Sequence, residues 1–162
     1  MLLGAAFAAS AADPAPEIAR APGKPQAVGV AHTLRTIPEA CARLEGAFTG
    51  DAAQPYRFAA VRTSPNCQPR ARFVDAAKAK PSVAAGWVLN DVIRVPSAAC
   101  FTQHAQVQVW RRAGQGAPPA LDGQGRSRVY LQDAKQQAAA DRTPPVPMFA
   151  AQLSIEGKSC GS

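Results

Sequence analysis

Short stretches of this chain alternate apolar and polar residues, which is the period of a β-strand with one buried face. The clearest stretch is 101–111, where Ala105 and Val107 alternate with Gln106 and Gln108. Runs of similar length recur along the chain with Pro and Gly between them, so we expect further strands in these runs. The expected ranges are 28–37, 41–48, 56–63, 70–74, 87–95, 126–132 and 148–156.

The breaks between these runs carry turn residues rather than long helical patterns. Pro38 either interrupts one long strand or separates two, and 50–55 and 64–69 are expected turns. Only 75–85 and 133–142 are rich enough in Ala to form a short helix. The pattern therefore predicts a mostly β fold, a small antiparallel β-sandwich or barrel-like domain with at most one or two short helices. The alternative is an α+β fold with 133–142 packed on one sheet.

Four cysteines allow three pairings. A hairpin after the second expected strand would bring Cys41 close to Cys67. Antiparallel pairing of the strand that follows Cys100 with the last strand would bring Cys100 opposite Cys160. We therefore predict two disulfides, Cys41–Cys67 and Cys100–Cys160, which are typical of proteins in an oxidising compartment.

The N-terminal residues predict export. Residues 1–11 are apolar and rich in Ala and end in Ala9-Ser10-Ala11, which fits the cleavage rule of a signal peptide although no basic residue precedes the apolar run. Residues 12–27 then form a Pro-rich linker, expected to be extended and unpacked, and 28–162 form a single domain. The alternative is a disordered Ala-rich tail. No later run is long and apolar enough to span a membrane.

The chain carries a formal net charge of +7, and Arg outnumbers Lys 13 to 5. Such a charge attracts the chain to anionic lipids, acidic glycans and acidic proteins. A bias in amino-acid usage toward Ala and Arg explains part of it, so the charge alone identifies no ligand. Nucleic acid is not an expected partner, because export separates the two.

The sequence contains no recognisable catalytic or metal-binding pattern. The cysteines form no Cys-x-x-Cys pair, there is no Gly-x-Ser-x-Gly elbow, and the Gly-rich loop at 113–125 lacks the residues of a phosphate-binding loop. His32 and His104 are the only histidines, and His104 is expected to face solvent. We therefore expect no catalytic residues, no metal and no cofactor. Glu39 and Glu45 could form a carboxylate pair, but with Arg43 between them a surface charge ladder is the preferred interpretation.

Two groups of residues are candidates for a binding surface. One is a basic cluster on expected neighbouring strands around the Cys67 turn, consisting of Arg57, Arg62, Arg70 and Arg72. The other is Trp110 with Arg111 and Arg112, because a half-exposed Trp beside Arg is common at protein interfaces. The alternatives are a solvated basic surface for the first group and a Trp110 buried under the 113–125 loop for the second.

These observations favour an exported, periplasmic or secreted, non-enzymatic binding module, such as an inhibitor, an immunity protein or an envelope accessory protein. One alternative is a protein held by charge to anionic envelope lipid or glycan. Another is a hydrolase whose site is assembled from residues scattered along the sequence.

Overall fold

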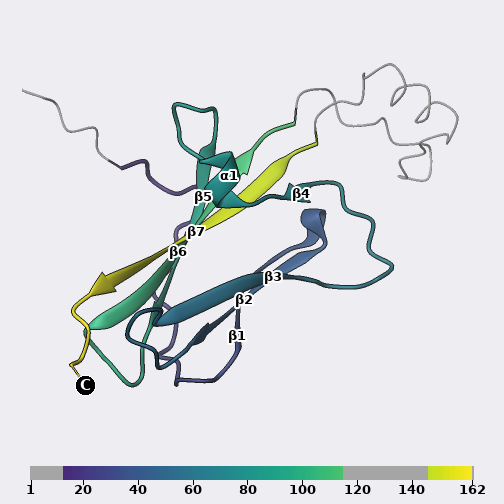
Figure 1. The fold of residues 1–162 in the computed structure, drawn as a ribbon. Helices are drawn as coiled ribbons and strands as arrows, with labels where there is room; N and C mark the ends of the chain where they lie inside the picture. Colours follow the sequence, from purple (N-terminus) through teal and green to yellow (C-terminus); the bar gives the residue numbers. More distant parts are fainter. Residues whose placement is uncertain (1–12, 115–145, 162) are drawn as a thin grey trace, which may run out of the picture.

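Seven strands form two sheets in the computed structural model, whose described residues are 13–114 and 146–161 (Figure 1). The first sheet has the order β1-β2-β3, and both of its strand pairs are antiparallel. Its strands are β1 (His32–Ile37), β2 (Ala42–Phe48) and β3 (Tyr56–Arg62). Pro38 begins a single 3-10 turn, η1 (Pro38–Ala40), so of the two alternatives the one with two strands separated at Pro38 is correct, and these strands pair antiparallel.

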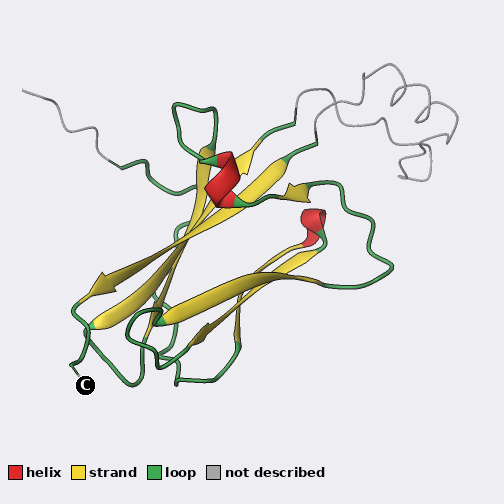
Figure 2. Cartoon of the chain, viewed as in Figure 1, coloured by secondary structure: helices red, strands yellow, loops and turns green. Residues whose placement is uncertain are grey.

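The second sheet has the order β4-β7-β6-β5. Its strands are β4 (Arg72–Phe73), β5 (Val88–Pro96), β6 (Gln103–Arg112) and β7 (Met148–Gly157). β5, β6 and β7 pair antiparallel, whereas β4 pairs with β7 in parallel. A single turn of helix, α1 (Ala76–Ala79), follows β4 (Figure 2). The mostly β prediction is confirmed; the strand expected at 126–132 and the helix expected at 133–142 lie outside the described residues.

The two sheets pack face to face around the main core. From the first sheet, Leu44 and Phe48 are buried, and from the second, Val107 and Val109. Alternation along β6 decides this packing: Ala105, Val107 and Val109 are each 0% exposed and point into the sandwich. The amphipathic pattern predicted for this strand is therefore the pattern that builds the core.

A second apolar cluster covers the outer face of the four-stranded sheet. Trp87, Leu89 and Trp110 are buried there, and α1 packs over them through Ala76 and Ala79. This explains why a short Ala-rich helix forms at this point: it shields apolar side chains that would otherwise lie on the solvent face of the sheet.

Both disulfides join the predicted cysteines, Cys41 to Cys67 and Cys100 to Cys160. In the β2–β3 hairpin Ala42 lies opposite Arg62, so Cys41, immediately before β2, faces the start of the turn that carries Cys67. In the β6–β7 pair Gln103 lies opposite Gly157, a register that places Cys100 three residues before one strand opposite Cys160 three residues after the other. The antiparallel register of each strand pair thus brings the two cysteines of each disulfide together.

The Pro-rich segment is extended, but the prediction that it is unpacked was wrong. Its amides donate to carbonyls of β5: Glu17 to Leu89 (3.1 Å), Ile18 to Asn90 (2.9 Å) and Gly23 to Arg94 (2.8 Å). Further along, the amide of Gln26 donates to Pro96. The prolines fall between these donors, so their missing N–H groups leave no bond unmade. The segment therefore covers the outer edge of β5.

The described residues contain no helix long and apolar enough to cross a membrane.

Candidate binding surface

The two lateral sides of the sandwich differ, because one is closed by the N-terminal segment and the other is open. On the closed side, β1 and β5 are the edge strands. Residues 17–26 run along β5, and Arg35 of β1 reaches across to Asn90 and Asp91 of β5. Main-chain bonds therefore hold the N-terminal segment on β5, and side-chain bonds from Arg35 join the two sheets on this side.

Asp91 lies at the centre of the closed side. A bulge between Leu89 and Asp91 turns its side chain to the inner face of the sheet, where it is 0% exposed. Arg20 holds this carboxylate with two bonds, from Nε to Oδ1 (3.1 Å) and from Nη2 to Oδ2 (2.7 Å). Arg35 adds a contact from Nη1 to Oδ2 at 3.4 Å. A buried carboxylate is thus matched by two guanidinium groups, as a buried charge requires.

The same polar network continues outward to Glu17. Asn90 donates to the Glu17 carboxylate (2.8 Å), and Arg111 of β6 donates to it from Nε (3.0 Å). Hydrogen bonds from Arg111 and then Asn90 lower the pKa of Glu17 from 4.5 to about 2. Arg111 is therefore an anchor for the N-terminal segment, which takes it out of the predicted interface group.

On the open side the edge strands are β3 and β7, and within the described residues β4 covers β7 only at its first two positions. The carbonyl of Phe149 accepts from Val74 of the β4 segment, so odd-numbered residues of β7 direct their main-chain groups toward this edge. Beyond Phe149 these are Ala151, Leu153 and Ile155, for which no main-chain partner lies among the described residues. Among residues 13–114 and 146–161, β7 therefore presents a free strand edge beyond β4.

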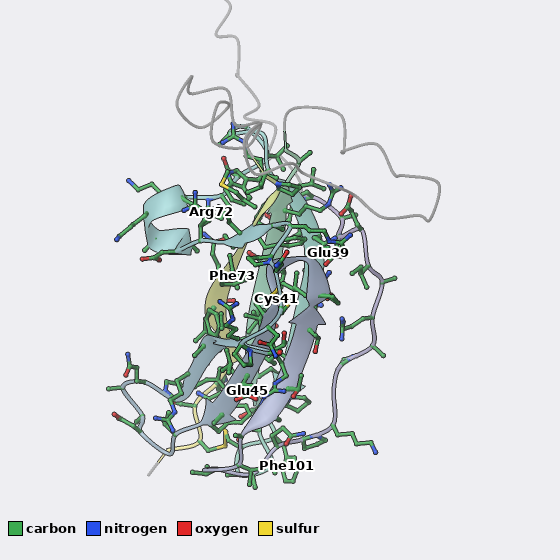
Figure 3. All side chains as sticks on the ribbon, turned by 90° about the vertical axis from the view of Figure 1, so that its right-hand side faces the viewer. Glu39, Cys41, Glu45, Arg72, Phe73 and Phe101 are labelled. Atoms are coloured by element: carbon green, nitrogen blue, oxygen red, sulfur yellow. A yellow bond between two sulfur atoms is a disulfide. The ribbon has the colours of Figure 1, made fainter. Side chains whose placement is uncertain are left out.

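Two shallow hollows follow one another along the open side. The lower one is lined by Phe58 of β3, Asp75–Ala77 and residues 151–154 of β7. The upper one is lined by Ala60–Arg62 of β3 and by Ala71–Phe73, with Cys41 at its floor. In Figure 3 the labelled residues of this hollow, Cys41, Arg72 and Phe73, lie in the same part of the molecule. Both hollows are lined by residues of β3 and of 71–77, although they share no lining residue, and we refer to the two together as the open-side groove.

The structure separates the four arginines of the predicted basic cluster. Arg57 lies opposite Ala47, at the far end of β3 from the Cys67 turn, and its odd position puts it on the outer face. Arg70 precedes β4 and donates its amide to Glu39. Only Arg62 and Arg72 line the open-side groove. The prediction of one cluster around the turn was wrong because the register of β3 places its two arginines at opposite ends.

Arg62 and Arg72 differ in how they are held. The Arg62 guanidinium donates from Nε to the Ser64 carbonyl and from Nη2 to the Cys67 carbonyl, both at 2.9 Å, and so also braces the turn. Arg72 is exposed, and among the described residues neither guanidinium forms an ion pair. The upper hollow is therefore positively charged with no carboxylate in place to neutralise it.

Trp110 is not a surface residue. It is 7% exposed, packs in the outer apolar cluster, and donates from Nε1 to Oε1 of Gln152 at 2.9 Å. Arg111 binds Glu17, and Arg112 is exposed at the end of β6. Of the two interpretations of Trp110, the buried one is correct: residues of the sheet and of α1 pack around it, while residues 115–125 of the loop expected to cover it lie outside the described residues.

The residues considered for catalysis do not gather in one place. His32 bonds through Nε2 to the buried Tyr56 hydroxyl at 2.7 Å, and burial raises the pKa of that hydroxyl. His104 is half-buried on the outer face, opposite Pro96 and Glu156. The described part of the chain has no cluster of three or more potential metal ligands.

The two glutamates of the charge ladder are also apart. Glu39 is in the 3-10 turn, whereas Glu45 is on β2 and pairs with Arg43. Figure 3 shows them at different heights of the molecule. The ladder is therefore reduced to the Arg43–Glu45 pair, and the two carboxylates do not face each other across a site.

Sequence analysis missed the Asp91 network and the free edge of β7. The polar pair Asn90-Asp91 inside the apolar run of β5 was a signal, since a charged residue in a buried strand needs a partner. The free edge had no local signal, because strand order decides which edge is covered.

Comparisons of the chain with family models, with curated proteins and with solved structures found no match.

Proposed function

We propose that the protein is an exported, non-enzymatic binding module that engages a partner protein through the open-side groove. The observation that carries the proposal is the asymmetry of the sandwich. One lateral side is sealed by the N-terminal segment and a buried ion-pair network, while the other has a strand edge beside a groove, and no described residue pairs with that edge beyond β4. Exposed strand edges are commonly blocked by charges, prolines or covering segments, so an unblocked edge on a rigid frame is suited to recognition.

Two further observations support this function. The two disulfides fit an oxidising compartment outside the cytoplasm. They also tie down both ends of the frame, and a rigid surface loses little conformational entropy when it binds. A partner could therefore be bound without refolding of this chain.

Site-specific photo-crosslinking in the native cell tests the proposal. A photo-reactive amino acid replaces Ser154, an exposed residue of β7 that lines the groove, or Phe101, which is 79% exposed in the turn before β6 and lines neither hollow (Figure 3). We expect one discrete adduct from position 154 and none from position 101. The absence of any adduct at 154, or the same adducts from both positions, contradicts the proposal.

Electrostatic attachment to envelope lipid or glycan is the second candidate, favoured by the unpaired arginines and the net charge of +7. Co-sedimentation with vesicles containing anionic phospholipid distinguishes it. Attachment by charge predicts binding that falls steeply with salt and falls equally for Arg57→Glu and Arg72→Glu, because each changes the net charge by the same amount. A partner-binding groove predicts no such vesicle binding.

A further inference from the structure

The chemistry of the open-side groove narrows the class of partner. We propose that it binds an extended peptide segment of the partner, with alternating apolar residues and an acidic residue toward one end, which adds as a strand to the free edge of β7. This inference rests on the proposed function and specifies what the groove recognises.

The main-chain groups along the edge of β7 require an extended main chain as their hydrogen-bond partner. Ala151, Leu153 and Ile155 direct three N–H and three C=O groups toward the open side, at the spacing of a strand. From Ala150 to Ile155 the strand has no charged residue, no proline and no bulge. These are the devices that keep other edges from pairing, and their absence here leaves β7 able to accept a strand in line with β4.

The half-buried apolar residues beside the groove favour apolar side chains on one face of the added strand. Leu153 and Ile155 pack only partly against the main core, as do Phe58 of β3 and Phe73 of β4. An added strand would direct every second side chain between the sheets, onto these half-buried residues. Its remaining side chains would face solvent, so the bound segment should alternate apolar and polar residues.

The charges in the two hollows favour an acidic residue at one end of the bound segment. The upper hollow holds Arg62 and Arg72 without a carboxylate partner among the described residues. Because Arg62 already donates from Nε and Nη2 to the turn carbonyls, Arg72 is the residue whose guanidinium fork would bind a carboxylate with two parallel bonds. The lower hollow contains Asp75, whose carboxylate caps α1 by accepting from the Ala77 amide. An acidic residue is therefore favoured at the upper end of the segment only. A second copy of this chain fits less well, because each copy carries a net charge of +7.

The test starts from a random library of short peptides, displayed on phage and selected on the oxidised protein. Selected peptides are synthesised, and their affinities are measured by fluorescence anisotropy. We expect enriched sequences that alternate apolar and polar residues and carry Asp or Glu toward one end. Failure to enrich any sequence overturns the inference.

Matched variants then test the main-chain contact. Leu153→Pro removes an N–H that points to the free edge while the bonds of β7 to β6, made by the even-numbered residues, are kept. Leu153→Val keeps the N–H and an apolar side chain. We expect Leu153→Pro to weaken binding about tenfold or more and Leu153→Val to change it by about twofold or less. Circular dichroism checks that both variants are folded, and peptides that bind folded Leu153→Pro as tightly as wild type overturn strand addition.

The charged contact has its own pair of variants. Arg72→Glu places a negative charge in the upper hollow, whereas Arg57→Glu makes the same change of net charge on the outer face of β3. We expect a loss of about tenfold for Arg72→Glu and little change for Arg57→Glu. Equal losses for the two variants would mean that only overall charge matters and would overturn the acidic end of the segment.

Two outcomes separate this inference from the proposed function. A partner that crosslinks at position 154 but binds Leu153→Pro normally leaves the binding module intact and overturns strand addition. Self-association in sedimentation velocity that Leu153→Pro abolishes shows that a second copy occupies the edge, and this also overturns the acidic-peptide inference.

Discussion

At the scale of single residues, Asp91 is the charged group in the described structure that depends most on its ion-pair partners. It is fully buried, and its charge is compatible with the core only because Arg20 and Arg35 bring two cations to it. Burial lowers the pKa of the Arg35 guanidinium and Asp91 opposes that shift, but arginine stays protonated in either case. One carboxylate thus connects β5, β1 and the N-terminal segment.

Removing that carboxylate should destabilise the protein strongly. We expect Asp91→Ala to lower the free energy of unfolding by about 3–5 kcal/mol, because Arg35 is left partly buried without its counter-charge. Arg43→Ala, which breaks the partly exposed Arg43–Glu45 pair, should change it by about 1 kcal/mol or less. Urea denaturation of both variants measures the difference. Similar small losses would mean that Asp91 is not the organising charge.

Glu17 gives the structure a specific pH dependence. Hydrogen bonds from Arg111 and Asn90 favour its ionised form, so its folded-state pKa of about 2 lies below the value of 4.5 for an unperturbed group. Ionised Glu17 therefore stabilises the folded state above pH 4.5, and this contribution is lost as pH falls from 4.5 through 2. An NMR titration of its carboxyl carbon should find the low midpoint, and Arg111→Gln should raise it. A wild-type midpoint near 4.5 would contradict the Glu17–Arg111 contact.

At the scale of elements, the Pro-rich N-terminal segment covers the edge of β5. Its donors at Glu17, Ile18, Gly23 and Gln26 reach β5 and its end, while prolines stand between them. Isolated parallel bridges at Ile18 and Gln26 mark where it pairs, without a continuous ladder. This segment, which has the composition of a linker, therefore prevents β5 from pairing with other chains.

Truncation tests this role. A chain that starts at Ala27 loses Arg20 and all four main-chain donors, and we expect a lower melting temperature and self-association through the bared β5 edge. A chain that starts at Glu17 keeps every one of these contacts and should resemble the chain that starts at Ala12. Differential scanning calorimetry and sedimentation velocity measure both effects. Equal stability of the two truncated chains would show that the segment does not contribute to the fold.

Pattern analysis predicted the elements well where the periodicity and the punctuation were local. The hairpin β2–β3, the one-turn helix before Pro81 and the strand β6 all follow from short-range signals. The arginine cluster was wrong because its residues were grouped by closeness in sequence. Arg57 and Arg62 are five positions apart on β3. This offset places them at opposite ends of the strand and, because it is odd, on opposite faces of the sheet.

At the scale of the whole molecule, the disulfides tie together parts that lie at sheet ends. Cys41–Cys67 closes a separation of 26 residues and holds the turn after β3 against the start of β2. Cys100–Cys160 closes a separation of 60 residues and fastens the C-terminal end to the turn before β6 (Figure 1). Each bond lowers the entropy of the unfolded chain, and the longer closure has the larger effect.

Replacing each pair by serines should therefore have unequal effects. We expect the free energy of unfolding to fall by about 3.5 kcal/mol for the Cys41–Cys67 pair and by about 4 kcal/mol for the Cys100–Cys160 pair, from the chain-entropy model. Denaturation by guanidinium chloride of the two double variants measures these losses. Unchanged stability in either variant would show that the corresponding disulfide does not constrain the unfolded chain.

The sequence by itself determined the fold class, the strand periodicity and the Cys41–Cys67 pairing, because each depends on alternation and on turns that are local in the chain. The Cys100–Cys160 pairing was also predicted correctly, but only by assuming that the strand after Cys100 pairs with the last strand. Only the tertiary structure decided which edges are covered, where Asp91 points and which arginines share a groove. These depend on strand order, on one bulge in β5 and on contacts between residues 56–94 positions apart, such as Arg20 with Asp91 and Glu17 with Arg111. No local pattern encodes such pairings, since the free energy that selects them comes from burying groups that meet only when the sheets pack.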